Sequence, residues 1–151
     1  MRGKVYLVGA GPGDPELLTL KALRLLRQAD VVLHDELVGP EILGYIRSAA
    51  RLHNVGKRNG HRSTPQAEIH TLLVQYASMG LQVVRLQGGD PLVFGRAGEE
   101  IEALRAAGIE FEIIPGVTSA LGAAASTQIP LTHRQLASSF LVVTGDRKSV
   151  V

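Results

Sequence analysis

Cysteine is absent from the 151 residues of this sequence. The chain can therefore form neither a disulfide framework nor a thiolate metal site, which fits a reducing compartment. No segment approaches the roughly 18 consecutive apolar residues that a membrane span needs. Only about five apolar residues precede the first Gly-Pro pair, too few for the core of a secretion signal. We therefore expect a cytoplasmic protein with no membrane partner.

A strong excess of one charge is also missing. Lys and Arg number 16 against 14 Asp and Glu, which gives a net charge of +2. Such a small excess does not favour nucleic acid as a partner. The five histidines are scattered without the spacing of metal ligands, so we expect no metal. A composition of 45% hydrophobic and 20% charged residues is typical of a globular domain with a core.

Short runs rich in Val, Ile and Leu alternate with segments of helical periodicity. The predicted strands are residues 4–9, 30–35, 51–56, 82–87 and 110–116. This alternation predicts an α/β fold, with a largely parallel five-stranded sheet and helices on both faces. The carboxyl ends of parallel strands share one rim, where ligands bind in such sheets. A sixth strand-like run, residues 138–146, has no obvious partner in this sheet.

Two of the predicted helices have start signals. One begins after Asp14, with Pro15 in its first turn, and runs to about residue 29. Another begins at Thr64 and Pro65, by the same logic. Shorter helices are predicted at 40–48, 97–107 and 118–126.

The loop after the first strand, "GAGPGD" at residues 9–14, looks at first like a dinucleotide-binding loop. That motif needs glycine at its first, third and sixth positions, and the sixth position here is Asp14. Pro12 also removes one amide donor from a loop that would have to bind pyrophosphate. The loop therefore does not favour NAD or FAD, and a tight turn without any ligand is the alternative.

Six motifs in order carry a wider resemblance. They read "VGAGPGDPELLTLKAL", "ADVVLHDELVGPEIL", "VGKRNGHRSTPQAEI", "VVRLQGGDPLVFGRAGEEIEAL", "PGVTSALGAA" and "IPLTHR". Together they resemble the tetrapyrrole methylase family. "GKRNGH" followed by "STPQ" and "LTHR" is similar to the branch that methylates uroporphyrinogen III. The family usually has lysine at the position of Gln87 and a bulkier aromatic residue at that of Leu92.

The resemblance implies a function and a domain organisation. The implied reaction is S-adenosylmethionine-dependent C-methylation of uroporphyrinogen III at two pyrrole carbons, which gives precorrin-2 for sirohaem or cobalamin synthesis. It also implies a homodimer. The family carries a second α/β domain after "LTHR", so residues 1–135 would be the first domain and 136–151 a linker and first strand of a truncated second domain. The alternatives are another precorrin methylase and a non-catalytic first-domain fragment.

The resemblance also assigns reactive and substrate-binding residues. Asp35 is implied as the proton acceptor, although it could instead cap the following helix. Lys57 is implied as the proton donor, although it could instead anchor a substrate carboxylate. Uroporphyrinogen carries eight carboxylates, and Arg96, Glu99 and Arg134 would steer it, since guanidinium groups bind carboxylates bidentately. A solvated surface is the alternative for these cations, and Glu99 could simply favour a helix N-terminus.

The cofactor contacts are implied in three rim loops. Glycines there let the backbone approach a bulky nucleoside, and a carboxylate can accept hydrogen bonds from it. By resemblance, the residues that contact S-adenosylmethionine are Pro12, Gly88, Gly89, Asp90, Val93, Thr118 and Ser119.

Overall fold

A parallel sheet forms the centre of the molecule. The computed structural model describes residues 3–56 and 64–145. The strands are β1 (Lys4–Gly9), β2 (Val31–His34), β3 (Arg51–Asn54), β4 (Gln82–Gln87) and β5 (Glu110–Ile114). They pair in parallel in the order β3-β2-β4-β1-β5. The predicted α/β fold is confirmed, and each of these strands lies within two residues of its predicted bounds.

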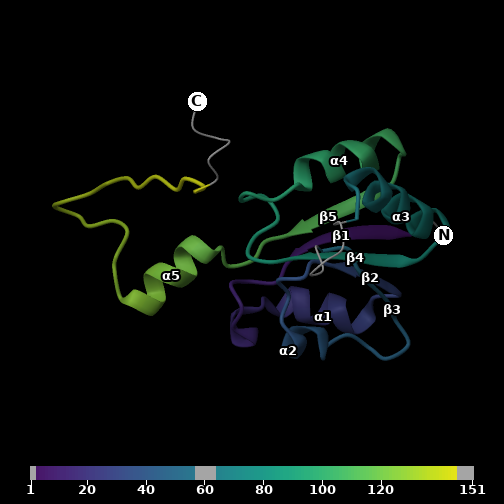
Figure 1. Ribbon diagram of the computed structural model, residues 1–151, viewed down its shortest axis with the longest axis horizontal. Helices are drawn as coiled ribbons and strands as arrows, with labels where there is room; N and C mark the ends of the chain where they lie inside the picture. Colours follow the sequence, from purple (N-terminus) through teal and green to yellow (C-terminus); the bar gives the residue numbers. More distant parts are fainter. Residues whose placement is uncertain (1–2, 57–63, 146–151) are drawn as a thin grey trace.

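Helices cover both faces of this sheet. The described helices are the 3-10 turn η1 (Pro15–Leu17), α1 (Leu20–Gln28), α2 (Pro40–Leu43), α3 (Gln66–Ser78), α4 (Ala97–Ala106) and α5 (Ser119–Thr127), of which α5 leads away from the sheet. Figure 1 shows α3 and α4 on one face, and α1 and α2 on the other. Side chains alternate along each strand, so Leu7 and Leu33 pack with the α3 and α4 side, while Val8 and Val32 pack with α1 and α2.

The first predicted helix begins later than the sequence suggested. Asp14 does act as a cap, with its Oδ1 accepting from the Glu16 amide at 2.8 Å, but only for the short turn η1. The chain then becomes extended, and Thr19 caps α1 by accepting from the Ala22 amide at 3.1 Å. The prediction was wrong here because two capping residues follow each other, and the second begins the α-helix.

Two further helix predictions need correction. Thr64 does not cap α3, because Pro65 occupies the N-cap position and no side chain caps this helix. The helix predicted at 40–48 ends at Leu43. Beyond it the chain continues in tight turns, in which the Tyr45 amide donates to the Ile42 carbonyl at 3.1 Å.

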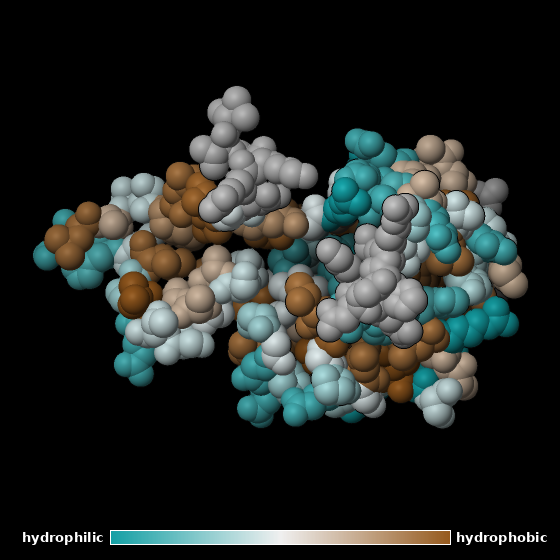
Figure 2. Space-filling model, viewed as in Figure 1, coloured by the Kyte–Doolittle hydropathy of each residue, from teal (hydrophilic) through white to brown (hydrophobic). Residues whose placement is uncertain are grey.

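The sixth predicted strand does not form within the described residues 138–145. The helix α5 leads the chain away from β5, and the segment after it lies beyond the sheet (Figure 1). It therefore cannot pair with either edge strand. Its apolar side chains are exposed, including Phe140, Leu141 and Val143. Figure 2 shows apolar side chains gathered on this arm, which comprises α5 and residues 128–145.

Charge pairs join Lys4 at the beginning of β1, and Lys21 of α1, to two glutamates of β5. Lys4 Nζ lies 2.9 Å from Glu110 Oε1 and 3.2 Å from Glu112 Oε2, and Lys21 also pairs with Glu112. The hydrogen bonds from Lys21 and Lys4 hold the pKa of Glu112 below its usual value. The same carboxylates raise the pKa of Lys4. These charges bind one another and do not line the pocket at the rim of the sheet.

Glycines let the chain at the rim ends of β1, β4 and β5 meet backbone against backbone. Gly11 and Gly89 exchange two amide hydrogen bonds, at 3.1 and 2.7 Å, and both have positive φ, at 77° and 66°. A Cβ built on Gly116 would lie 2.2 Å from the Gly89 carbonyl oxygen and 2.9 Å from Gly9 Cα. No larger residue fits at 116 without separating the loops.

We predict that Gly116→Ala lowers the free energy of unfolding by about 1–3 kcal/mol or more, since overpacking forces backbone shifts of this cost. Urea denaturation measures it. Gly98→Ala is the matched control, because a Cβ at Gly98 meets nothing within 4 Å and alanine favours the helix. Equal stability of the two variants would contradict the close approach.

Candidate active site

A pocket of about 300 Å³ lies at the carboxyl rim of the sheet. Its walls come from the loops after β1, β2, β4 and β5. The lining residues are Gly11, Pro12, Leu37, Gly88, Gly89, Asp90, Val93, Phe94, Thr118 and Ser119. All the residues that the sequence analysis assigned to the cofactor are among them. The structure thus brings these residues together, while their contact with a cofactor stays a prediction.

The pocket walls are held in place by close packing. A Cβ on Gly122 of α5 would lie 2.8 Å from Pro12 Cβ, so this glycine lets α5 contact the first loop. A Cβ on Gly89 would lie 3.8 Å from the Ser119 amide nitrogen, at ordinary contact distance. The beginning of α5 therefore forms the wall opposite the "GGDP" turn.

Asp90 has a structural role besides the cofactor contact predicted for it. Its Oδ1 accepts from the Leu92 amide at 2.8 Å, and its Oδ2 accepts from the Gly116 amide at 3.0 Å. Both carboxylate oxygens thus bind backbone within the pocket wall. The side chain joins the β4 loop to the β5 loop, while its contact with the cofactor stays a prediction.

Three lining residues, Gly11, Leu37 and Phe94, were not assigned to the site by the sequence analysis. Leu37 and Phe94 add apolar surface to the pocket, and the Phe94 side chain is 65% exposed. Phe94 has φ of 53°, a left-handed conformation that is uncommon for a residue with a side chain. Phe94 lies in a tight turn that requires glycine at position 95, because a Cβ there would lie 2.5 Å from the Pro91 carbonyl oxygen. Gly95 is the sequence signal for this turn.

Asp35 lies directly beyond β2, beside the pocket residue Leu37. Its amide donates to the Leu86 carbonyl at 3.2 Å, and its Oδ1 lies 2.7 Å from Arg85 Nη2. The side chain does not cap the following helix, because the N-cap of α2 is Gly39. The alternative role for Asp35 is therefore wrong, and its carboxylate belongs to the rim.

The sequence analysis also missed a buried polar network behind Asp35. Arg85 on β4 is 5% exposed, and Glu100 on α4 is fully buried. Arg85 Nε donates to Glu100 Oε1 at 2.9 Å, and Gln87 Nε2 donates to Glu100 Oε2 at 2.9 Å. In the sequence, the signal for this network is a charged residue within an otherwise apolar strand, together with a charged residue on the following helix. Gln87, which departs from the family pattern, thus faces this network and not the pocket.

The sequence pattern of the tetrapyrrole (corrin/porphyrin) methylases matches residues 4–150. This chain belongs to the tetrapyrrole methylase family. It is 58% identical over 143 residues to the uroporphyrinogen-III C-methyltransferase of Cyanidium caldarium, covering 95% of this chain and 57% of that protein. It is 56% identical over 147 residues to the siroheme synthase of Hahella chejuensis, covering 97% of this chain and 31% of that protein. The chain therefore spans only part of the length of these relatives.

Solved structures agree with this membership. A crystal structure of uroporphyrin-III-C-methyltransferase from Thermus thermophilus is 55% identical, with a TM-score of 0.87 over 99% of this chain and 64% of that chain. A structure of the Thermus thermophilus enzyme complexed with S-adenyl homocysteine is 51% identical, with a TM-score of 0.74 over 90% of this chain and 53% of that chain.

The remaining residues predicted by resemblance to the methylases are not gathered in the pocket. Arg96 is the N-cap residue of α4, and its Nε lies 3.6 Å from Glu99 Oε1, with both side chains exposed to solvent. Arg134 is exposed on the arm that leaves the sheet with α5. Lys57 lies outside the described residues. Substrate contacts of these residues stay predictions.

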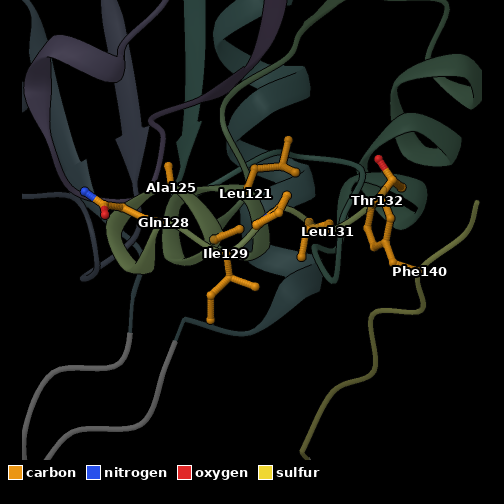
Figure 3. A pocket seen from close by; sticks show the side chains of 9 residues that line it. Leu121, Ala125, Gln128, Ile129, Leu131, Thr132 and Phe140 are labelled. Atoms are coloured by element: carbon orange, nitrogen blue, oxygen red, sulfur yellow. The ribbon is translucent and has the colours of Figure 1, made fainter. Parts of the chain in front are cut away.

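This methylase domain has a second, more apolar hollow of about 520 Å³ on the arm. Figure 3 shows Leu121 and Ala125 of α5 beside Ile129 and Leu131, with Phe140 contributed by the last part of the arm. It contains none of the residues predicted for catalysis or for the cofactor. Its lining is an exposed apolar surface, distinct from the rim pocket.

The described parts of the chain show neither a cluster of metal ligands nor a membrane-spanning helix. Within residues 3–56 and 64–145, no three His, Asp or Glu side chains gather in a way that could hold a metal ion. In the same ranges, no helix is long and apolar enough to cross a membrane.

We predict that Asp90→Asn lowers the free energy of unfolding by about 1–3 kcal/mol, the cost of leaving a partly buried donor unpaired. Asparagine keeps one acceptor oxygen, but its amide group would face a backbone N–H. Asp14→Asn is the control, because asparagine caps helices as well as aspartate does. Urea unfolding of both variants checks this. A loss no greater than that of the control would refute the bridging role of Asp90.

Proposed function

We propose that the protein carrying this chain is an S-adenosylmethionine-dependent C-methyltransferase that converts uroporphyrinogen III to precorrin-2, for sirohaem or cobalamin synthesis. The observation that carries the proposal is the rim pocket. It unites the cofactor residues implied by resemblance, in a chain more than half identical to proteins named for this activity.

The chemistry of the pocket lining supports the proposal that it contacts S-adenosylmethionine. Gly88 faces Leu37, and a Cβ built on Gly88 would lie 3.5 Å from Leu37 Cβ, at van der Waals contact. The missing side chain of Gly88 therefore keeps the space in front of Leu37 open. Val93 and Phe94 offer apolar surface, and Thr118 and Ser119 offer hydroxyl groups. When bound, S-adenosylmethionine supplies an activated methyl group on a sulfonium sulfur. The pocket volume of about 300 Å³ is at the lower limit for small-molecule sites. We therefore propose that this domain provides only one wall of the cofactor site.

We propose that Asp35 acts on the substrate next to this wall. Methylation of a pyrrole carbon puts positive charge on the ring, and a carboxylate beside the ring stabilises that charge. The same carboxylate can then accept the proton that the ring loses. Asp35 suits this role because its side chain is 31% exposed at the rim, while Arg85 binds its Oδ1 from the protein interior.

We predict that Asp35→Asn lowers kcat about 10²- to 10⁴-fold, as expected for the loss of a general base. Methyl transfer from labelled S-adenosylmethionine to uroporphyrinogen III measures kcat, and calorimetry checks that cofactor affinity is unchanged. Asp30→Asn is the matched control, because Asp30 precedes β2 at its opposite end and pairs with Arg47. Unchanged turnover in Asp35→Asn would disprove the assignment. Wild-type protein without any methyl transfer would overturn the proposed function itself.

Substrate carboxylates require cations beside the pocket, and Arg96 is the described candidate nearest to it in sequence. Its side chain is exposed, and its only described ion pair is the 3.6 Å contact with Glu99. The planar guanidinium suits a carboxylate ligand. Arg134 and Lys57 are proposed as further anchors on the basis of the family resemblance, and Lys57 also as the proton donor.

We predict that Arg96→Met raises the KM for uroporphyrinogen III about three- to tenfold, the effect of losing one exposed charge-assisted contact. The Kd for S-adenosylmethionine should not change. Arg105→Met, at the other end of α4, serves as the control, since Arg105 lies over the Phe111 ring away from the rim. A larger effect on cofactor binding than on the substrate would exclude this role.

The rest of the assembly is also a proposal. We propose that residues 136–151 are a linker and the beginning of a second domain, which would cover the apolar arm. The exposure of Leu136, Phe140 and Leu141 supports this, because soluble proteins rarely leave such clusters uncovered. A homodimer in the cytoplasm is proposed on the family resemblance alone.

A further inference from the structure

We propose that Arg85 positions the Asp35 carboxylate, and that the buried Glu100 sets the direction of the Arg85 guanidinium. The proposal deepens the function above and rests on Asp35 being the proton acceptor. It concerns two charged residues that lie behind the pocket and do not line it.

Arg85 lies in the middle of the sheet. It belongs to β4, which has β2 on one side and β1 on the other. Its Nη2 lies 2.7 Å from Asp35 Oδ1, its Nε donates to Glu100 Oε1 at 2.9 Å, and its Nη1 donates to the Leu86 carbonyl at 3.3 Å. Each of its three nitrogens therefore has an oxygen partner. A planar guanidinium with all its nitrogens bound has no freedom to rotate.

Glu100 is the fixed end of this arrangement. Its side chain is fully buried, and three donors reach its carboxylate: Arg85 Nε, Gln87 Nε2 at 2.9 Å and Gln66 Nε2 at 3.2 Å. Across the described parts of the chain, no buried side-chain nitrogen or oxygen lacks a partner. These donors come from β4 and from the first turn of α3, so Glu100 is immobilised from two elements.

The two carboxylates that Arg85 binds differ in exposure, and this difference gives the network a direction. Glu100 is fully buried and Asp35 is 31% exposed, so the guanidinium is anchored in the interior and presents one nitrogen to the rim. A buried cation needs one anionic partner to be stable. Glu100 is this anionic partner of Arg85. The contact between Arg85 and Asp35 is therefore not required for charge balance and can orient the Asp35 carboxylate.

Replacing Arg85 by lysine would separate its charge balance with Glu100 from its orientation of Asp35. Its ammonium is a compact charge without a fork, and cannot reach two carboxylates in the fixed geometry of a guanidinium. It would remain with the fully buried Glu100, because an unpaired charge there is the costlier state. Asp35 would then lose its partner while the core kept its charge balance.

The other end of β2 offers a matched pair for the experiment. Arg47 Nη2 binds Asp30, and Arg47 Nε donates to the Ala29 carbonyl at 2.7 Å. This pair also joins an arginine fork to an aspartate beside β2, but at the amino end, away from the pocket. Arg47→Lys therefore tests the loss of a similar ion pair without any change at the rim.

The experiment compares Arg85→Lys, Arg47→Lys and wild type in the protein that carries this chain. We expect Arg85→Lys to lower kcat about 10- to 100-fold, because misplacing a reacting group by about 1 Å has that effect. The KM for S-adenosylmethionine should stay within about twofold, and Arg47→Lys should keep the wild-type kcat. A folded Arg85→Lys with wild-type kcat, or an equal loss in both variants, would overturn the proposal.

Two further measurements distinguish a failure of the proposed role of Arg85 from a failure of the proposed methyltransferase function. If Arg85→Lys does not fold, Glu100→Gln replaces it, since it keeps the shape and removes the anchoring charge. The same reduction of kcat at unchanged KM is expected, and wild-type kcat overturns the proposal. Crystal structures of wild type and variant also report the Asp35 side chain. An unmoved carboxylate overturns the positioning role even if the wild type shows no methyl transfer, a result that would itself refute the proposed function.

Discussion

The close approach of three backbones at the rim is the constraint on which the rest of the structure depends. Gly9, Gly89 and Gly116 lie so near one another that a single added carbon on Gly116 would reach 2.2 Å from a carbonyl oxygen. Because these loops follow β1, β4 and β5, the junction unites three neighbouring strands at their carboxyl ends. Asp90 strengthens it by binding the Gly116 amide. The pocket exists because this junction brings the "GGDP" turn against the start of α5.

Beside this junction, polar groups enter an otherwise apolar layer. Burying Arg85 and Glu100 carries a desolvation cost that an apolar pair would avoid, so such a network contributes little to stability by itself. Its value lies in direction, because several donors arranged around one carboxylate permit a single geometry. At the rim the network ends at the partly exposed carboxylate of Asp35. The same layer therefore combines a packed core with a defined orientation at the rim.

Much of the fold could be predicted because its signals are local. Apolar runs that alternate with helical segments predicted the bounds of each strand to within two residues, and glycine with proline indicated the rim loops. Errors arose where two local signals competed. Asp14 and Thr19 both cap, and only the tertiary packing of α1 selects the second as the helix start. Residues 138–145 have strand composition, but a strand also needs a free edge within reach, and α5 carries them away from the sheet.

The sequence by itself determined the α/β class, the rim loops and the membership of the tetrapyrrole methylase family, because these depend on periodicity, punctuation and ordered motifs. Only the tertiary structure decided which of two adjacent glutamates is buried, since Glu99 and Glu100 differ by their angle on α4 and by what packs against each side. It also decided the partner of Asp35. Arg85 is distant in sequence, and it meets Asp35 because the strand order places β2 beside β4, a pairing that no local pattern specifies.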